Sequence, residues 1–84
     1  MLGKFYVYII KSSKNNSYYV GCTKDIEARI AKHNQGAVYS TRSFKPWTLL
    51  YTENYQTLSE ARRREIQVKK WKSRAAIERL LKTS

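Results

Sequence analysis

The chain has 84 residues, which is enough for one small domain and too few for two domains with separate cores. Its composition, with 42% hydrophobic residues and seven tyrosines, excludes an intrinsically disordered protein, and its single cysteine, Cys22, excludes an intrachain disulfide and a zinc site built from several thiolates. Seventeen lysines and arginines against six acidic residues give a formal net charge of +11, which favours nucleic acid as the partner over anionic lipid or a merely soluble basic surface.

The first apolar run, FYVYII at residues 5–10, is too short and too rich in tyrosine for the hydrophobic core of a signal peptide. No segment approaches the roughly 20 apolar residues that a membrane-spanning helix needs. We therefore expect a single domain over residues 1–84 that resides in the cytoplasm and has no membrane partner.

Two runs rich in β-branched and aromatic residues, KFYVYIIK at 4–11 and YYVGCT at 18–23, flank the polar cluster SSKNNS. This pattern predicts a β-hairpin with a loop of five or six residues. Because side chains alternate along a strand, Tyr6, Tyr8 and Ile10 are predicted to share one face of the first strand, and the residues between them the other. Both faces are expected to be covered.

A helix is predicted over residues 23–36, TKDIEARIAKHNQG. Thr23 is the expected N-cap, acidic residues follow in the first turn, and Gly36 supplies the stop. Helical spacing places four residues on one inward stripe, namely Ile26, Arg29, Ile30 and His33. Two of these four are polar.

The stretch 37–47 has turn and extended character, and WTLLYTENY at 47–55 predicts a third strand after Pro46. TLSE at 57–60 predicts a capping box at the start of a second helix that runs to about Lys72. Ser73 is expected to cap a last helix. The order β-β-α-β-α-α indicates an α+β domain with a small, mostly antiparallel sheet and helices packed against it.

Glu65 is the residue of the second helix that fits its expected surroundings least. It falls on a stripe with small and apolar residues, where the helix should meet the sheet. The stripe comprises Leu58, Ala61, Glu65, Val68 and Lys72. An unpaired buried carboxylate costs on the order of several kcal/mol, so Glu65 must pair with a cation, bind a metal or line a cleft. A salt bridge to an arginine, Arg29 included, is the simplest structural explanation.

Arg29 and His33 are four residues apart, so their side chains emerge one helical turn from each other. Each has an ordinary structural explanation when taken singly. Gly21 precedes a helix N-terminus, where it allows either a tight turn or the approach of a phosphate to backbone amides. Convergence of Arg29 and His33 with Glu65 and the hairpin tyrosines would indicate a catalytic site.

The motifs Tyr6-Val7-Tyr8 and Tyr19-Val20-Gly21, followed by a helix with Arg29 and His33-Asn34, resemble the GIY-YIG nuclease superfamily. Tyr6 and Val7 depart from the Gly and Ile of the name-giving motif, while Tyr8, Tyr19 and Gly21 match. The later part of the chain resembles the small stand-alone bacterial URI-type members, in the positions Pro46, Leu49 to Tyr51, Glu53, Glu65 and Lys70-Trp71. The resemblance implies a three-stranded antiparallel sheet flanked by helices.

The resemblance also implies an endonuclease that hydrolyses phosphodiester bonds in DNA with a divalent metal. Glu65 would be the sole protein ligand of one Mg²⁺ or Mn²⁺. Arg29 would hold the phosphoryl oxygens. Tyr8 or Tyr19, with Tyr8 preferred, would help to deprotonate the attacking water, and Arg29, metal-bound water and His33 would lower the pKa of that tyrosine or relay its proton.

Substrate contacts are expected from five further positions, Gly21, Lys24, Asn34, Lys69 and Lys72, with Asn34 alternatively fixing the helix end. The basic runs at 62–64 and 69–72 would hold the DNA backbone, and Trp71 either stacks on an unpaired base or packs in the core. The alternative function is a basic nucleic-acid-binding module that cuts nothing. The residues are compatible with branched or single-stranded DNA as substrate, with roles in repair, recombination or defence, and with a partner protein or a homodimer.

Overall fold

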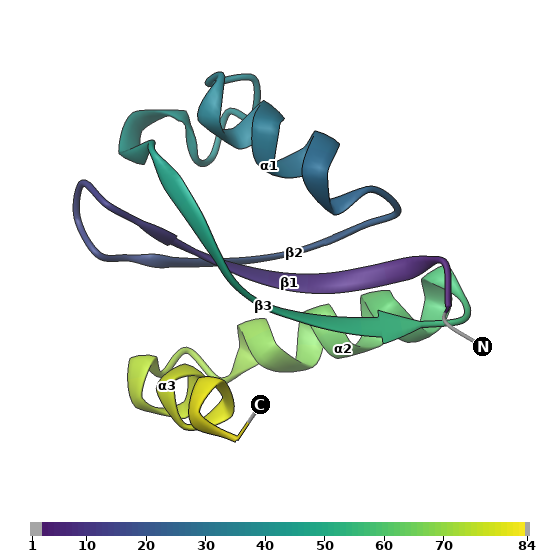
Figure 1. The fold of residues 1–84 in the computed structure, drawn as a ribbon. Coiled ribbons are helices and arrows are strands. Elements are labelled where there is room, and N and C mark those ends of the chain that lie inside the picture. Colours follow the sequence, from purple (N-terminus) through teal and green to yellow (C-terminus); the bar gives the residue numbers. More distant parts are fainter. Residues whose placement is uncertain (1–2, 84) are drawn as a thin grey trace.

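The computed structural model describes residues 3–83, which form a three-stranded antiparallel sheet and three helices (Figure 1). The strands are β1 (Phe5–Ser12), β2 (Tyr18–Thr23) and β3 (Trp47–Tyr55), in the order β2-β1-β3. The helices are α1 (Ile26–Asn34), α2 (Leu58–Lys70) and α3 (Arg74–Lys82), and a 3₁₀ turn, η1, spans Arg42–Phe44. The expected α+β class and the order β-β-α-β-α-α are confirmed.

The central strand β1 is covered on both faces, as the apolar and aromatic residues on both of its faces predict. α1 lies on one side of the sheet, and α2 and α3 lie on the other (Figure 1). Val7 and Ile9 pack in the core beneath α2 and α3, whereas Tyr8 and Ile10 pack with Trp47 beneath α1. None of the four β1 residues exposes more than 1% of its surface. The sheet therefore separates two small cores.

A β-bulge in β3 lets this strand serve both cores. Ile9 pairs with Tyr51 and Ile10 with Leu49, so Leu50 is the extra residue. Side chains directly opposite each other in an antiparallel pair share a face. Leu49 and Trp47 therefore face α1, whereas Tyr51 faces α2. Without the bulge, Trp47 would lie on the wrong side of the sheet to meet α1.

The helix ends agree with the sequence except at two places. Asp25, not Thr23, is the N-cap of α1, with its carboxylate accepting from the amide of Ala28 at 3.1 Å. Thr23 lies two residues before this cap, and its hydroxyl instead accepts from the amide of Asp25 at 3.2 Å, which forms a local turn ahead of the helix. Gly36, with φ of +79°, ends α1 as predicted.

The second difference is the end of α2, which stops at Lys70 and not near Lys72. Lys72 has φ of 46°, a left-handed conformation that ends a helix. The capping box of Thr57 and Glu60 and the Ser73 cap of α3 are both confirmed. Between residues 3 and 83, none of the helices combines the length and the apolar character that crossing a membrane requires.

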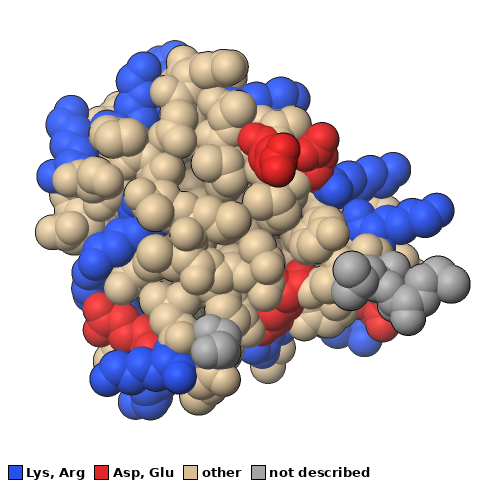
Figure 2. Space-filling model, viewed as in Figure 1, with Lys and Arg blue, Asp and Glu red and all other residues tan. Residues whose placement is uncertain are grey.

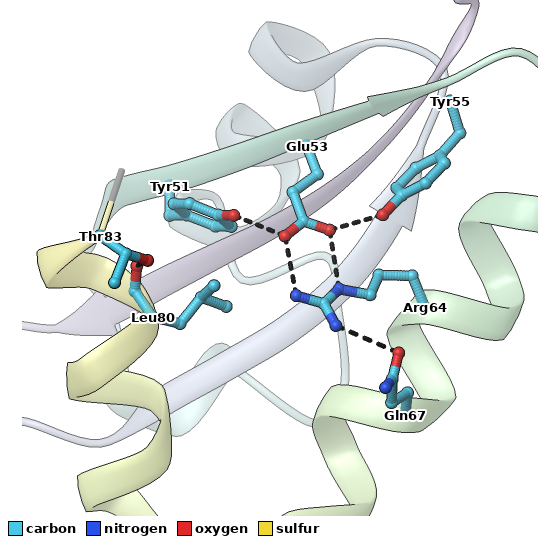
Figure 3. Close-up of polar contacts among 7 residues, drawn as sticks. All are labelled: Tyr51, Glu53, Tyr55, Arg64, Gln67, Leu80 and Thr83. Carbon is cyan, nitrogen blue, oxygen red and sulfur yellow. Dashed lines mark hydrogen bonds and ion pairs between the residues drawn. The ribbon is translucent and has the colours of Figure 1, made fainter.

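A carboxylate on β3 anchors α2 to the sheet (Figure 3). Arg64 donates to Glu53 through Nε at 2.9 Å and through Nη2 at 3.1 Å, and the hydroxyls of Tyr51 and Tyr55 donate to the same carboxylate. Burial would raise the pKa of Glu53, but these hydrogen bonds outweigh it and lower that pKa. Because Glu65 follows Arg64 on α2, the anchor also sets the direction in which Glu65 points.

Candidate active site

Tyr8 and Gly21 lie directly opposite each other on β1 and β2. The ring of Tyr8 crosses over Gly21, and a Cβ at this position would overlap the hydroxyl end of that ring. Gly21 therefore makes room for Tyr8. This packing reason is one that the sequence motif did not reveal, and a contact between Gly21 and substrate stays a prediction.

The Tyr8 hydroxyl lies between α1 residues. It is 2.8 Å from Nε2 of His33 and accepts from Nε of Arg29 at 3.4 Å. Tyr8 exposes none of its surface. Burial raises the pKa of Tyr8, and the hydrogen bond and charge of Arg29 offset only part of this effect. Arg29 thus lowers the pKa of Tyr8 in the expected direction, but burial has the larger effect in the free protein.

His33 is fully buried between α1 and the sheet. Its Nδ1 lies 2.7 Å from Oγ1 of Thr41, and the Tyr19 ring meets the imidazole edge to face, with centroids 5.2 Å apart. Burial, and secondarily the charge of Arg29, lower the pKa of His33 to about 4. His33 is therefore neutral at neutral pH.

Glu65 reaches the same site from α2, on the other side of the sheet. Its Oε2 lies 2.8 Å from the ammonium of Lys69, and that ammonium lies 5.6 Å from the centroid of the Tyr19 ring. The charge of Glu65 also contributes to raising the pKa values of Tyr8 and Arg29. The salt-bridge partner of Glu65 is thus Lys69 and not Arg29.

The structure therefore brings together the five residues that the sequence singled out. An unbroken chain of contacts runs from Arg29 through Tyr8, His33, Tyr19 and Lys69 to Glu65. Tyr19 lies on the edge strand β2, which is why groups from helices on opposite faces of the sheet can meet at this strand.

A pocket of about 380 Å³ opens beside Arg29. Its lining includes four cationic side chains, Lys24, Arg29, Lys32 and Arg62. Such a cluster can hold a phosphate. Arg62 belongs to the basic run 62–64 that was expected to hold the DNA backbone, whereas Lys32 was not singled out from the sequence, although it lies three residues from Arg29, one helical turn away. That spacing is the signal that could have identified it.

The remaining predicted contacts divide between site and scaffold. Lys24 lines the pocket, and Lys69 belongs to the site through Glu65 and Tyr19. The Asn34 side chain donates to the carbonyl of Trp47 and accepts from its amide, so it fastens α1 to the start of β3. Lys72 is exposed beyond the end of α2. Substrate contacts by Asn34 and Lys72 stay predictions.

Trp71 packs partly buried against the core beneath α2 and α3, with the Arg64 guanidinium carbon 5.5 Å from its ring centroid. The core interpretation of Trp71 is thus the one that the contacts favour.

Figure 2 shows the face seen in Figure 1, where lysines and arginines gather at the edges and the middle is mostly uncharged.

The side chains of the site can hold only a metal ion that takes most of its ligands from water or substrate. Residues 3–83 contain no group of three or more His, Cys, Asp and Glu side chains placed to hold a metal ion. Glu65 offers one carboxylate, with 14% of its side chain exposed. Mg²⁺ retains several waters and binds through one or two carboxylates plus substrate phosphate. Glu65 fits such an ion, bound together with a phosphate.

A family model described as the GIY-YIG catalytic domain matches residues 4–79. The chain is 49% identical over 70 residues to UPF0213 protein SH2523 of Staphylococcus haemolyticus, covering 81% of this chain and 83% of that protein. It is 48% identical over 66 residues to UPF0213 protein SA0446 of Staphylococcus aureus strain N315, covering 76% and 78%.

Among solved structures, the chain resembles the solution NMR structure of UPF0213 protein BH0048 from Bacillus halodurans. The TM-score is 0.62 at 36% identity, and the match covers 95% of this chain and 84% of that one. The names of these relatives state no activity. The similarity extends over almost all the elements that carry the site.

Proposed function

The chain belongs to the GIY-YIG catalytic-domain family, and from this membership and the site geometry we propose that it is a divalent-metal-dependent endonuclease that hydrolyses phosphodiester bonds in DNA. The family consists generally of endonucleases that use divalent metals. The observation that carries the proposal is the continuous contact between Arg29, Tyr8, His33, Tyr19, Lys69 and Glu65. A binding surface alone does not need this arrangement.

Arg29 would hold the phosphoryl oxygens. Its guanidinium lines the cationic pocket and already donates to Tyr8, so it would contact both the phosphate and the tyrosine that takes a proton from the attacking water. Charge that builds on the phosphoryl oxygens in the transition state is stabilised by such a fixed donor. Lys24, Lys32 and Arg62 would position the flanking DNA backbone in the same pocket.

Glu65 would hold the divalent ion, Mg²⁺ or Mn²⁺, with water and phosphate oxygens as the other ligands. When bound, the ion supplies positive charge that polarises the phosphate and stabilises the leaving oxygen. Lys69 would turn from Glu65 toward the DNA backbone, which its exposed side chain allows.

Tyr8 would take a proton from the attacking water while passing its own to His33. In the free protein this transfer is uphill, because burial raises the pKa of Tyr8 and lowers that of His33 to about 4. A bound phosphate would add negative charge near the imidazole, which favours its protonated form.

The burial of Tyr8 favours the second candidate, a DNA-binding module that keeps the fold and the charge of +11 but cuts nothing. Such a module would bind DNA with steep salt dependence and show no dependence on a metal. The complete set of Arg29, His33, Glu65 and both tyrosines favours the enzyme.

The test is a cleavage assay with single-stranded, duplex, flapped and branched DNA of the same sequence, in Mg²⁺, in Mn²⁺ and in EDTA. The proposal expects cutting of at least one substrate in metal and none in EDTA. Preference for the flapped or branched forms would support a role in repair or recombination. If no substrate is cut although all are bound, the binding module is the better explanation.

A further inference from the structure

Thr41 is a buried polar residue that the proposed chemistry does not yet use. It exposes none of its surface and lies in the segment between α1 and β3. Its Oγ1 is 2.7 Å from Nδ1 of His33 and donates to the carbonyl of Val38 at 3.4 Å. Its own carbonyl accepts from Nε1 of Trp47 at 2.9 Å. The hydroxyl is therefore held against the imidazole from both sides.

The hydrogen bonds of Tyr8 favour one of the two neutral tautomers of His33. Arg29 can only donate, so the Tyr8 oxygen is an acceptor in that contact. The buried Tyr8 proton still needs an acceptor, and within residues 3–83 the contact that provides one is Nε2 of His33. Nε2 is thus unprotonated, and the neutral ring carries its proton on Nδ1.

Thr41 completes the same chain of donors and acceptors. The Nδ1 proton of His33 goes to Oγ1 of Thr41, and the Thr41 proton goes to the carbonyl of Val38. In the opposite tautomer, Nε2 would donate to Tyr8 and leave the Tyr8 proton without an acceptor in the described part of the chain. Only the Nδ1–H form satisfies every proton in this buried row.

We propose that Thr41 is a positioning residue that holds His33 in the Nδ1–H tautomer and so keeps Nε2 ready to accept the proton of Tyr8. This inference rests on the proposed endonuclease function. In the step concerned, the O–H bond of Tyr8 breaks and an N–H bond forms at Nε2 of His33. The Tyr8 oxygen takes one proton from the attacking water in return, so the net result is one proton moved from water to His33. The resulting imidazolium keeps its proton on Nδ1, where it is hydrogen-bonded to Oγ1 of Thr41.

The direct test is the ¹⁵N NMR spectrum of the imidazole in the free protein at neutral pH. His33 is the only histidine of the chain, so both imidazole signals belong to it, and their couplings to the carbon-bound ring protons distinguish Nδ1 from Nε2. The wild type and Thr41→Ser are expected to show a protonated Nδ1 and an unprotonated Nε2. Thr41→Val, which keeps the shape and removes the hydroxyl, is expected to show a tautomer mixture or a protonated Nε2.

Cleavage kinetics provide the second readout. Thr41→Val is expected to lower kcat by roughly 10- to 100-fold with little change in KM for DNA, and Thr41→Ser to restore most of the rate. A protonated Nε2 in the wild type, or a Thr41→Val protein with unchanged tautomer or unchanged kcat, would overturn the inference. If Thr41→Val does not fold, the wild-type spectrum and Thr41→Ala serve the same purpose.

The two hypotheses fail separately. A wild type that cuts no DNA but has the expected tautomer would remove the proposed function and with it the catalytic purpose of Thr41. A wild type that cuts DNA with metal while Thr41→Val matches it in rate would leave the function intact and remove the role of Thr41.

Discussion

The ammonium of Lys69 lies 2.8 Å from Oε2 of Glu65, one turn away on α2. In the proposed mechanism, the same carboxylate holds the divalent ion. Lys69 therefore neutralises Glu65 in the free protein and must yield when the ion binds. Because 47% of the Lys69 side chain is exposed, turning it toward solvent or DNA costs little.

We predict that Lys69→Met lowers the metal concentration needed for half-maximal cleavage, because the competing cation is removed. The same variant should bind DNA more weakly, with the slope of log affinity against log salt reduced by about 1. Lys70→Met, at the adjacent exposed position, is the matched control and should leave the metal requirement unchanged. An unchanged or increased metal requirement in Lys69→Met would show that the two cations do not compete for Glu65.

Gly21→Ala should destabilise the protein by about 1–3 kcal/mol, because the new methyl group would overlap the end of the Tyr8 ring. Urea denaturation would measure the loss. In a Tyr8→Ala background the space is empty, so the same Gly21→Ala change should cost much less. Equal costs in the two backgrounds would mean that Gly21 is required for a reason other than Tyr8.

His33 should make the stability of the protein pH-dependent. The folded protein resists protonation of this imidazole until about pH 4, whereas an unfolded histidine takes up a proton near pH 6.5. Stability is therefore complete above pH 6.5 and falls as the pH decreases, by about 2 kcal/mol between pH 7 and 5. The lowered pKa of Glu53 affects stability only at lower pH, below the ordinary range of a carboxyl group.

Denaturation of the wild type and of His33→Gln over this pH range would measure the effect. The variant should lose the extra pH dependence, whatever its stability at pH 7. Parallel curves for the two proteins would show that His33 is not held neutral by burial and Arg29.

Arg64→Met should reduce both stability and cleavage. It removes two hydrogen bonds to the Glu53 carboxylate and thereby the anchor that fixes α2 and Glu65 (Figure 3). A charged hydrogen bond in a partly buried place contributes about 1.5–3 kcal/mol. Arg63→Met, at the neighbouring exposed position, removes the same charge and is the control. If both variants behave alike, net charge and not the anchor explains the loss.

The order and bounds of most elements could be predicted because each carries a local signal. The β1 alternation, the Gly36 stop and the Thr57 capping box depend only on neighbouring residues. The bulge at Leu50 could not be predicted, since it depends on the need of Trp47 and Tyr51 to reach different cores across the sheet. The predicted buried stripe of α2 is wrong at Leu58, which is the first residue of the helix and is 44% exposed.

The five central site residues could be proposed from the motifs, but their partners could not. Thr41 comes from a segment without a clear period, and only the fold brings its hydroxyl to His33. The pKa of Tyr8 was expected to fall because a cation is near, yet burial has the larger effect. Burial of this kind is a property of the assembled core and has no local signal in the sequence.

The most direct measurement compares Glu65→Gln with the wild type for metal-dependent cleavage and for DNA binding under identical conditions. Glu27→Gln, an exposed position on α1, removes the same charge and is the control. The account predicts that Glu65→Gln loses cleavage by roughly 100-fold or more while its DNA affinity and fold stay close to those of the wild type, and that Glu27→Gln cuts normally. A Glu65→Gln protein that cuts DNA at the wild-type rate with the same metal requirement would contradict it.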